Sequence, residues 1–129
     1  MIQTNAFDYI NVLDRAADAS WLRNEAISNN LANATTPGYK RQDVSFAEEL
    51  RRALGTGDER TMDERVRRAQ TRDLTPTAYT DSEGFSYRLD GNNVDPDTEN
   101  VYLAENQLMY QGLLSSITAE FQNLQSVMR

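Results

Sequence analysis

The apolar residues of this 129-residue chain are concentrated at its two ends. Large aliphatic and aromatic side chains are frequent in residues 1–34 and 95–129, whereas the longer middle, residues 35–94, is poor in them and holds five of the six glycines. At both ends these side chains recur at alternating spacings of three and four, the period of a helix that packs along another helix. The chain is therefore predicted to be mainly α. Long N- and C-terminal helices pair as a coiled-coil-like hairpin, and the loop-rich middle contains a short helix and a small β-hairpin.

The N-terminal segment, residues 1–34, is predicted to form the first helix of an inner core domain. Small and polar side chains occupy the centre of its repeat, so a neighbouring backbone can approach closely while little apolar area is buried. Trp21 lies off the repeat and has to find other contacts. The repeat consists of Ile10, Leu13, Ala17, Ser20, Asn24, Ile27, Leu31 and Ala34.

The C-terminal segment, residues 95–129, is predicted to form the second helix of that domain. Asp95 can cap this helix, and Pro96 suits its first position. Only two residues between 100 and 128 are charged, and Leu108 lies off the repeat. These features favour a helix enclosed by other protein over an amphipathic helix with a solvated, amide-rich surface. The repeat consists of Leu103, Gln107, Tyr110, Leu114, Ile117, Phe121, Leu124 and Met128.

The middle segment begins with a turn and a short helix. Thr36-Pro37-Gly38-Tyr39 has proline second and glycine third, which predicts a type II turn, and Pro37 is expected to end the first helix. The apolar residues from Phe46 to Leu54 share one helical face, and Gly55 can close that helix.

The rest of the middle segment is predicted to be less regular. Residues 57–73 carry dense mixed charge and are expected to be exposed and mobile. The alternating run from Phe85 to Leu89, followed by Asp90-Gly91, predicts a β-hairpin.

The composition excludes most active-site chemistry. The chain has no cysteine and no histidine, which removes thiolate nucleophiles, imidazole bases and the usual ligands of transition metals. Paired carboxylates such as Glu48 and Glu49 lie in charged sequence, without the apolar pocket that acid–base catalysis needs. Lys40 is the only lysine that could serve a hydroxyl nucleophile as a base. We therefore expect neither an enzyme nor a cofactor.

A calcium site is the remaining metal hypothesis. Asp90, Asn92, Asp95 and Asp97 lie close together and offer oxygen ligands, which calcium accepts. Their spacing does not match an EF-hand loop, and helix capping already accounts for Asp95. No metal is therefore expected.

The charge balance and the lack of long apolar runs restrict the partners. With 20 acidic and 13 basic residues the chain has a net charge of −7, which disfavours nucleic acid. No stretch approaches the roughly 20 apolar residues that span a bilayer, so no direct membrane insertion is expected. Asp8 and Asp14 stand where a secretory signal would be basic and then apolar, so export would not use a cleaved signal peptide.

Residues 28–40, Ser-Asn-Asn-Leu-Ala-Asn-Ala-Thr-Thr-Pro-Gly-Tyr-Lys, closely resemble the signature of bacterial flagellar axial proteins, the family of rod, hook and hook-associated proteins. The continuation over residues 41–50, the short length and the run Leu-Asp-Gly-Asn-Asn-Val-Asp at 89–95 are most similar to proximal rod proteins, because distal rod and hook proteins are much longer. Two types of proximal rod protein have similar lengths and similar ends. One of them usually departs from the Thr-Pro-Gly-Tyr sequence in this motif, so the presence of that sequence here favours the other type. Residues 55–84 carry no resemblance that we can name.

The resemblance implies a structural subunit that polymerises through its terminal helices. The assembly interface is then expected to include Ile10, Leu13, Ala17, Trp21, Ile27, Leu31, Leu103, Leu108, Tyr110, Leu114, Ile117, Phe121 and Leu124. The signature loop, Asn30, Asn33, Thr36, Pro37, Gly38, Tyr39 and Lys40, is expected to orient the N-terminal helix. Tyr39 would lodge against neighbouring protein, and Lys40 would lie near a carboxylate or a helix C-terminus.

The resemblance also implies partners and a location. The partners would be copies of the chain itself, rod proteins of the FlgC, FlgF and FlgG types, the adapter FliE, the MS ring and the type III export gate. The chain would lie in the flagellar basal body, in the periplasm, after export by the flagellar type III system.

A single pair of such helices buries too little apolar area to offset the ordering of the chain, which costs about 1–2 kcal/mol per residue. We therefore expect a partly folded monomer whose two ends order when neighbours supply further helix faces. The alternative is a soluble acidic helical adaptor or chaperone that binds one partner through the same heptads. A calcium-dependent module or a small hydrolase is a more distant third hypothesis.

Overall fold

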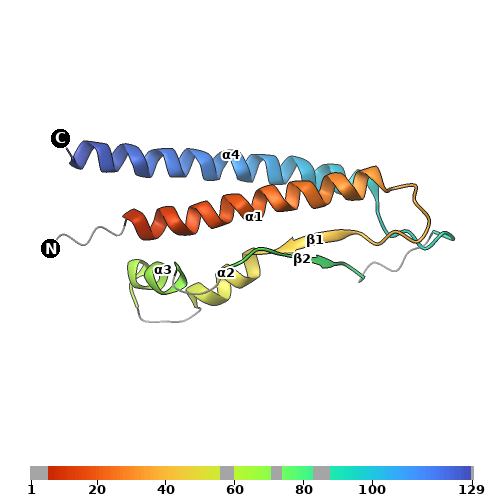
Figure 1. The fold of residues 1–129 in the computed structure, drawn as a ribbon, viewed down its shortest axis with the longest axis horizontal. Coiled ribbons are helices and arrows are strands. Elements are labelled where there is room, and N and C mark those ends of the chain that lie inside the picture. The colour runs from red at the N-terminus through yellow and green to blue at the C-terminus, as the bar shows by residue number, and fades with distance from the viewer. Residues whose placement is uncertain (1–5, 56–59, 71–73, 83–87, 129) are drawn as a thin grey trace.

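A computed structural model describes residues 6–55, 60–70, 74–82 and 88–128 (Figure 1). Two long helices, α1 (Ala6–Ala32) and α4 (Pro96–Val127), run antiparallel side by side, so that the start of α1 and the end of α4 lie at the same end of the molecule (Figure 1). This pairing confirms the predicted mainly α fold with a helical hairpin.

The middle segment forms a second layer on the side of α1 away from α4 (Figure 1). It contains two short helices, α2 (Ala47–Leu54) and α3 (Met62–Gln70), and two strands, β1 (Gln42–Ser45) and β2 (Thr77–Thr80). The strands pair antiparallel, with Gln42 opposite Thr80. A two-stranded sheet is therefore present, but it is formed by segments that the alternation did not single out. The hairpin run at 85–89 lies largely outside the described residues.

Helix α3 corrects the prediction that residues 57–73 are irregular, because residues 62–70 are helical, although most of its described side chains are exposed as predicted. Two small apolar side chains, Val66 and Ala69, lie one turn apart and are both buried. They are enough to hold the helix against the molecule while its charged side chains face outward. The flanking parts of the predicted segment, 56–59 and 71–73, lie outside the described residues.

The sequence predicts the residues that begin or end a helix at three places, and two of these predictions are confirmed. The Asp95 carboxylate accepts a hydrogen bond from the Asp97 N–H at 3.1 Å and caps α4, with Pro96 in the first turn. Gly55 ends α2 with a φ of 76°. The prediction that Pro37 ends the first helix is wrong, because α1 already ends at Ala32.

The apolar core is small and lies between α1 and the second layer. It consists of Ala19, Phe46, Ala69 and Leu74, with Leu50 and Leu54 packed against it. Among the described residues, the six largest fully buried side chains include four polar ones, Asn30, Asn92, Glu99 and Asn106. The molecule is therefore held together at least as much by buried hydrogen bonds as by apolar packing, which is consistent with the expected weak monomer.

Candidate assembly interface

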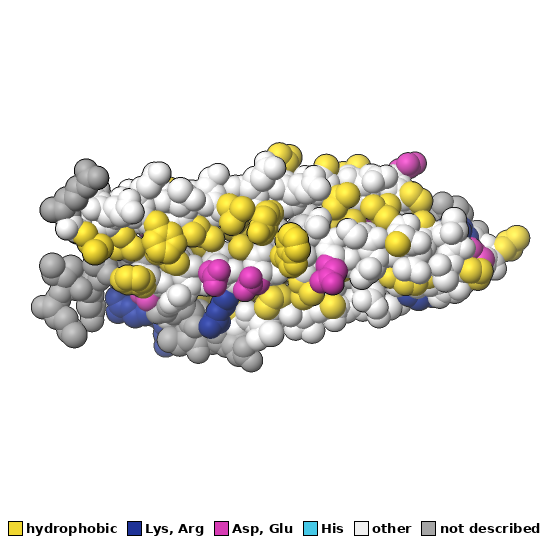
Figure 2. All heavy atoms as spheres, turned by 45° about the horizontal axis from the view of Figure 1, so that its top comes forward, with side chains coloured by type: hydrophobic (Ala, Val, Ile, Leu, Met, Phe, Trp, Pro, Cys, Tyr) yellow, Lys and Arg dark blue, Asp and Glu magenta, His cyan; other side chains and the backbone are white. Residues whose placement is uncertain are grey.

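Large apolar side chains stand exposed along the two long helices (Figure 2). Leu108 is 70% exposed, Trp21 62% and Phe121 51%. Beyond Asn106, no residue of α4 in the described part of the chain is buried. A helix that leaves so many aliphatic and aromatic side chains in water is typical of a surface that other protein covers.

The predicted interface residues divide into two groups. On α1, Ala17 and Ile27 are buried, and Ile10, Leu13 and Leu31 are half-buried. On α4 the predicted residues are less buried. Leu103, Tyr110, Ile117 and Leu124 are half-buried, and Leu108, Leu114 and Phe121 are exposed. One chain therefore covers most of the first repeat and leaves much of the second uncovered. That neighbouring subunits cover the rest stays a prediction.

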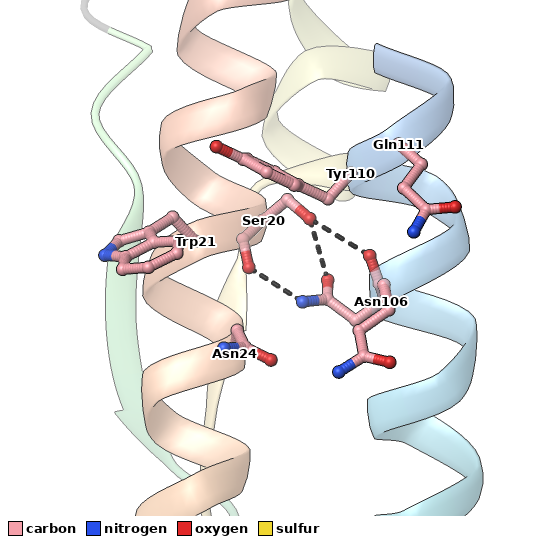
Figure 3. Close-up of a pocket in the computed structure, with 7 residues that line it drawn as sticks. Ser20, Trp21, Asn24, Asn106, Tyr110 and Gln111 are labelled. Carbon is pink, nitrogen blue, oxygen red and sulfur yellow. Dashed lines mark hydrogen bonds between the residues drawn. The ribbon is translucent and has the colours of Figure 1, made fainter. Parts of the chain in front are cut away.

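The two long helices meet through a polar contact at mid-length (Figure 3). The Ser20 hydroxyl donates to Asn106 Oδ1 at 3.0 Å, and Asn106 Nδ2 donates to the Ser20 carbonyl at 2.8 Å. Trp21 and Tyr110 lie beside this contact with ring centroids 6.2 Å apart. These four residues and Asn24 help to line an open pocket of about 370 Å³.

The signature loop binds the segment from Leu89 to Asp95. Gly38 has a φ of 75°, and the Tyr39 N–H donates to the Thr36 carbonyl at 3.3 Å, as the predicted type II turn requires. The Gly38 N–H donates to the Asp90 carbonyl at 2.7 Å. Two runs that are more than 50 residues apart in the sequence therefore form one structure, here called the two-loop contact.

Asn92 is the centre of the two-loop contact and explains the early end of α1. Its buried Nδ2 donates to the carbonyls of Asn33, Ala34 and Thr36 at 2.8–3.1 Å. Arg88 also donates to the Ala34 carbonyl, at 2.6 Å. Because these carbonyls are satisfied from outside the helix, the chain leaves the helix before it reaches Pro37.

Asn30 joins α1 to both neighbouring elements. Its amide exchanges two hydrogen bonds with the backbone of Gln42 at 2.8 and 2.9 Å, and its Nδ2 also donates to Glu99 at 3.2 Å. The Tyr39 hydroxyl donates to Asn30 Oδ1 at 3.4 Å. The Lys40 ammonium donates to the backbone carbonyl of Gly91, and its nearness to a carboxylate or a helix C-terminus stays a prediction.

The other predicted loop residues lie at the surface of the turn. Asn33 is half-buried, and its Nδ2 donates to the Asn29 carbonyl at 2.8 Å. Thr36 and Pro37 are exposed, and the Thr36 hydroxyl donates to Asn33 at 3.1 Å. The signature residues are therefore linked to one another by hydrogen bonds. That Tyr39 also contacts a neighbouring subunit stays a prediction.

Arg41 follows the signature loop and binds three carboxylates, an arrangement here called the Arg41 cluster. Its guanidinium lies 2.6 Å from Glu99, 2.5 Å from Asp81 and 3.1 Å from Asp43. Glu99, on α4, is 1% exposed. Arg23 of α1 also reaches Asp43, at 2.8 Å. The cluster thus joins α1 and α4 to β1 and to the residue that follows β2.

The contacts within the Arg41 cluster favour the charged forms of Arg41 and Asp43. Burial by itself would lower the pKa of Arg41, but the hydrogen bonds to Glu99 and Asp81 outweigh it and raise this pKa above its ordinary value. Burial by itself would raise the pKa of Asp43, but hydrogen bonds from Arg23, from the Val44 N–H and from Arg41 lower it below 3.8. The ion pair between Arg41 and Asp43 is therefore charged on both sides at neutral pH.

Acid is expected to weaken the fold through Asp43. Because the pKa of Asp43 is lower in the folded chain than its ordinary value of 3.8, its stabilising effect is complete above that value and is lost as the pH falls through the lowered pKa. Thermal melting should show a level midpoint above about pH 5 and a fall below about pH 4. The Asp43→Asn variant should show a smaller fall. An identical acid profile in the variant would contradict this assignment.

Gly38→Val is expected to strain the two-loop contact. A Cβ at Gly38 would meet no atom within 4 Å, so the cost comes from the positive φ alone, about 1–2 kcal/mol. The melting midpoint should fall, and rod assembly should be impaired. Gly112→Ala is the matched control, because Gly112 lies in α4 with equally open space and an ordinary helical φ. Its melting midpoint should hold or rise. Equal midpoints for Gly38→Val and the parent would show that the turn carries no constraint.

Sequence reasoning did not assign the positioning roles of Arg41, Asn92 and Glu99. The sequence considers Asn92 only as a calcium ligand and gives Glu99 no positioning role. The described residues contain no group of three or more carboxylates arranged to hold a metal ion. A signal was present, since Arg41 continues the signature run, but no spacing links it to a carboxylate 58 residues away.

No helix in the described ranges is both long enough and apolar enough to cross a membrane.

Comparison with known proteins agrees with the site. A family model described as flagella basal body rod protein matches residues 10–40, which hold most of α1 and the signature loop. The chain is 33% identical over 114 residues to the flagellar basal body rod protein FlgB of Escherichia coli K12, covering 83% of each chain. It is 35% identical to FlgB of Cereibacter sphaeroides, covering 95% of this chain and 94% of the relative. It is 32% identical to FlgB of Bacillus subtilis 168, covering 92% of each.

These relatives are structural rod proteins, so the expectation that the chain is not an enzyme is confirmed, and the adaptor alternative has no support. The match to the Cereibacter sphaeroides relative covers 95% of this chain, so it includes most of both long helices and both halves of the two-loop contact. The chain belongs to the FlgB family of flagellar basal body rod proteins.

Proposed function

We propose that the chain is a structural subunit of the proximal rod and polymerises through α1 and α4 into the first part of the flagellar drive shaft. The observation that carries this proposal is the uncovered face of α4, where Leu108, Leu114 and Phe121 stand exposed on a helix with almost no charge. In a FlgB family member, such a face fits a helix that neighbouring subunits enclose.

In this proposal the inner core domain consists of residues 1–34 and 95–129, and residues 35–94 form an outer segment. The Arg41 cluster and the two-loop contact hold the outer segment at a fixed orientation to α1 and α4. Contacts between subunits then need to involve only the exposed faces of α1 and α4, because the inner core domain and the outer segment are already held together within each chain.

The partners in this proposal are further copies, rod proteins of the FlgC, FlgF and FlgG types, the adapter FliE, and the MS ring with the export gate beneath. The subunit links that base to the rest of the axial structure. It reaches the periplasm through the flagellar type III system, without a cleaved signal peptide. The weak apolar core suits this route, because a chain with few large buried aliphatic side chains is easily kept unfolded.

A deletion strain tests the proposal. Cells that lack the chain should not swim, and their basal bodies should contain the MS ring without a rod, as seen by electron microscopy of purified particles. Expression of the chain from a plasmid should restore both. Complete rods in the deletion strain would contradict the proposal.

A further inference from the structure

Helix α1 has a further, exposed face, on which only Trp21 is known to lie against α4, beside the ring of Tyr110. Its residues follow one another at spacings of four and three, and every one of them is exposed. Three carry carboxylates, two are aromatic, and none is basic. This face, here called the outer stripe, consists of Phe7, Asn11, Asp14, Asp18, Trp21, Glu25, Ser28 and Ala32. Figure 2 shows acidic side chains in a line over the middle of the molecule, where α1 runs.

The described residues do not neutralise the carboxylates of the outer stripe. In the ranges that the structure describes, Asp14, Asp18 and Glu25 form no ion pair, although Arg15 lies next to Asp14 in the sequence. A partner for this face should therefore bring positive charge together with apolar contact for the two aromatic rings.

The pocket beside the stripe contains a buried hydrogen-bond acceptor that has no partner. Asn24 Oδ1 is buried without a partner and points toward the space between α1 and α4 (Figure 3). Trp21 and Tyr110 supply aromatic rings to the same pocket. A guanidinium fits this combination, since it donates hydrogen bonds in a plane and stacks on aromatic faces.

The chain itself carries the complementary surface. Seven of its 13 basic residues, all arginines, fall in residues 51–72. Helices α2 and α3 present four exposed ones, Arg51, Arg52, Arg67 and Arg68, of which Arg51 also pairs with Glu48 and Arg67 with Asp8 at the protein surface. This arginine face lies on the second layer, and within the described part of one chain none of the three stripe carboxylates pairs with it. A second copy can bring the two surfaces together.

We propose that the outer stripe of one copy receives the arginine face of α2 and α3 from a second copy, with one arginine entering the pocket beside Trp21. The proposal rests on the proposed rod function and names one of its lateral contacts. A contact between two unlike surfaces of the same chain is heterologous, and its repetition gives a ring or an open helix. A tube of subunits needs that kind of contact.

A charge swap in the deletion strain tests the contact. The stripe variant, Asp14→Arg with Asp18→Arg, places positive charge against the arginine face. The face variant, Arg52→Glu with Arg68→Glu, places negative charge against the stripe. Each should lose swimming and rods at an unchanged cellular level of the protein. The chain with all four changes should regain both, because the opposite charges face each other again.

Parent-like swimming of the stripe and face variants would overturn the contact, and so would a combined variant that fails as completely as either alone. These outcomes leave the rod function itself intact. The rod function fails only if the deletion strain builds complete rods.

Cross-linking identifies the occupant. The chain has no cysteine, so Asp18→Cys with Arg68→Cys places two thiols on an otherwise unreactive chain. Oxidised basal bodies should yield a ladder of multiples of this chain, whereas Asp18→Cys alone should give no ladder. Products that contain only a different basal-body protein would show that another subunit covers the stripe and would overturn the proposal.

Discussion

Replacing Arg41 by Met is expected to lower the free energy of unfolding by about 3–5 kcal/mol, because it leaves the buried Glu99 carboxylate without its cation. Glu99 is 1% exposed, and Arg41 supplies its closest charged contact, at 2.6 Å. Urea denaturation followed by circular dichroism measures the loss. The free energy of unfolding of a whole domain is only about 5–15 kcal/mol. The variant should therefore be largely unfolded in the region where Arg41 joins the elements.

The matched control is Arg52→Met, which removes an exposed arginine of α2. Surface charges of this kind contribute about 0–1 kcal/mol, so the control should unfold at nearly the parental urea concentration. Equal midpoints for the Arg41 and Arg52 variants would show that the Arg41 cluster does not hold the two parts of the chain together.

Phe121→Asp should abolish rod assembly while leaving the monomer unchanged. Phe121 is 51% exposed in the single chain, so a carboxylate there meets water and costs the monomer little. In a helix enclosed by neighbours, the same carboxylate would be buried without a partner, at a cost of several kcal/mol. Swimming should be lost, with an unaltered circular dichroism spectrum. Ile117→Asp should also abolish assembly, but it should disturb the monomer as well, because Ile117 is half-buried.

Phe121→Leu is the control for this prediction, because it keeps an apolar side chain at the same position. It should assemble and swim. If cells carrying Phe121→Asp swim as the parent does, this face of α4 is not enclosed in the rod.

Features that depend on neighbouring residues could be predicted from the sequence. Asp95 and Pro96 marked the start of α4, and Gly55 marked the end of α2, because capping and positive φ are local requirements. Gly38 likewise marked the type II turn. The spacing of apolar residues predicted both long helices, since it is repeated over several turns in α1 and in α4.

Features that depend on distant partners could not be predicted. β1 pairs with β2 across more than 30 residues, and neither four-residue strand has an alternating apolar pattern. The early end of α1 is set by Asn92, which lies nearly 60 residues further along the chain. An asparagine or arginine that is satisfied through such contacts looks the same in sequence as one in water.

The distribution of buried contacts gives the chain two unlike ends. Near Asn30, Arg41 and Glu99 the elements are joined by buried hydrogen bonds and ion pairs. At the other end, where α1 starts and α4 finishes, large side chains such as Phe121 remain exposed. Local stability follows buried contacts, so the first end should be ordered in the monomer and the second should order on assembly.

Amide hydrogen exchange along α4 tests this coupling of assembly to folding most directly. In the isolated chain, amides from Val101 to Asn106 should be protected, and those from Leu114 to Leu124 should exchange within the first time points. In purified basal bodies both stretches should be protected, because neighbouring subunits then cover the second. Equal, strong protection of both stretches in the isolated chain would contradict the claim that α4 is completed by its neighbours.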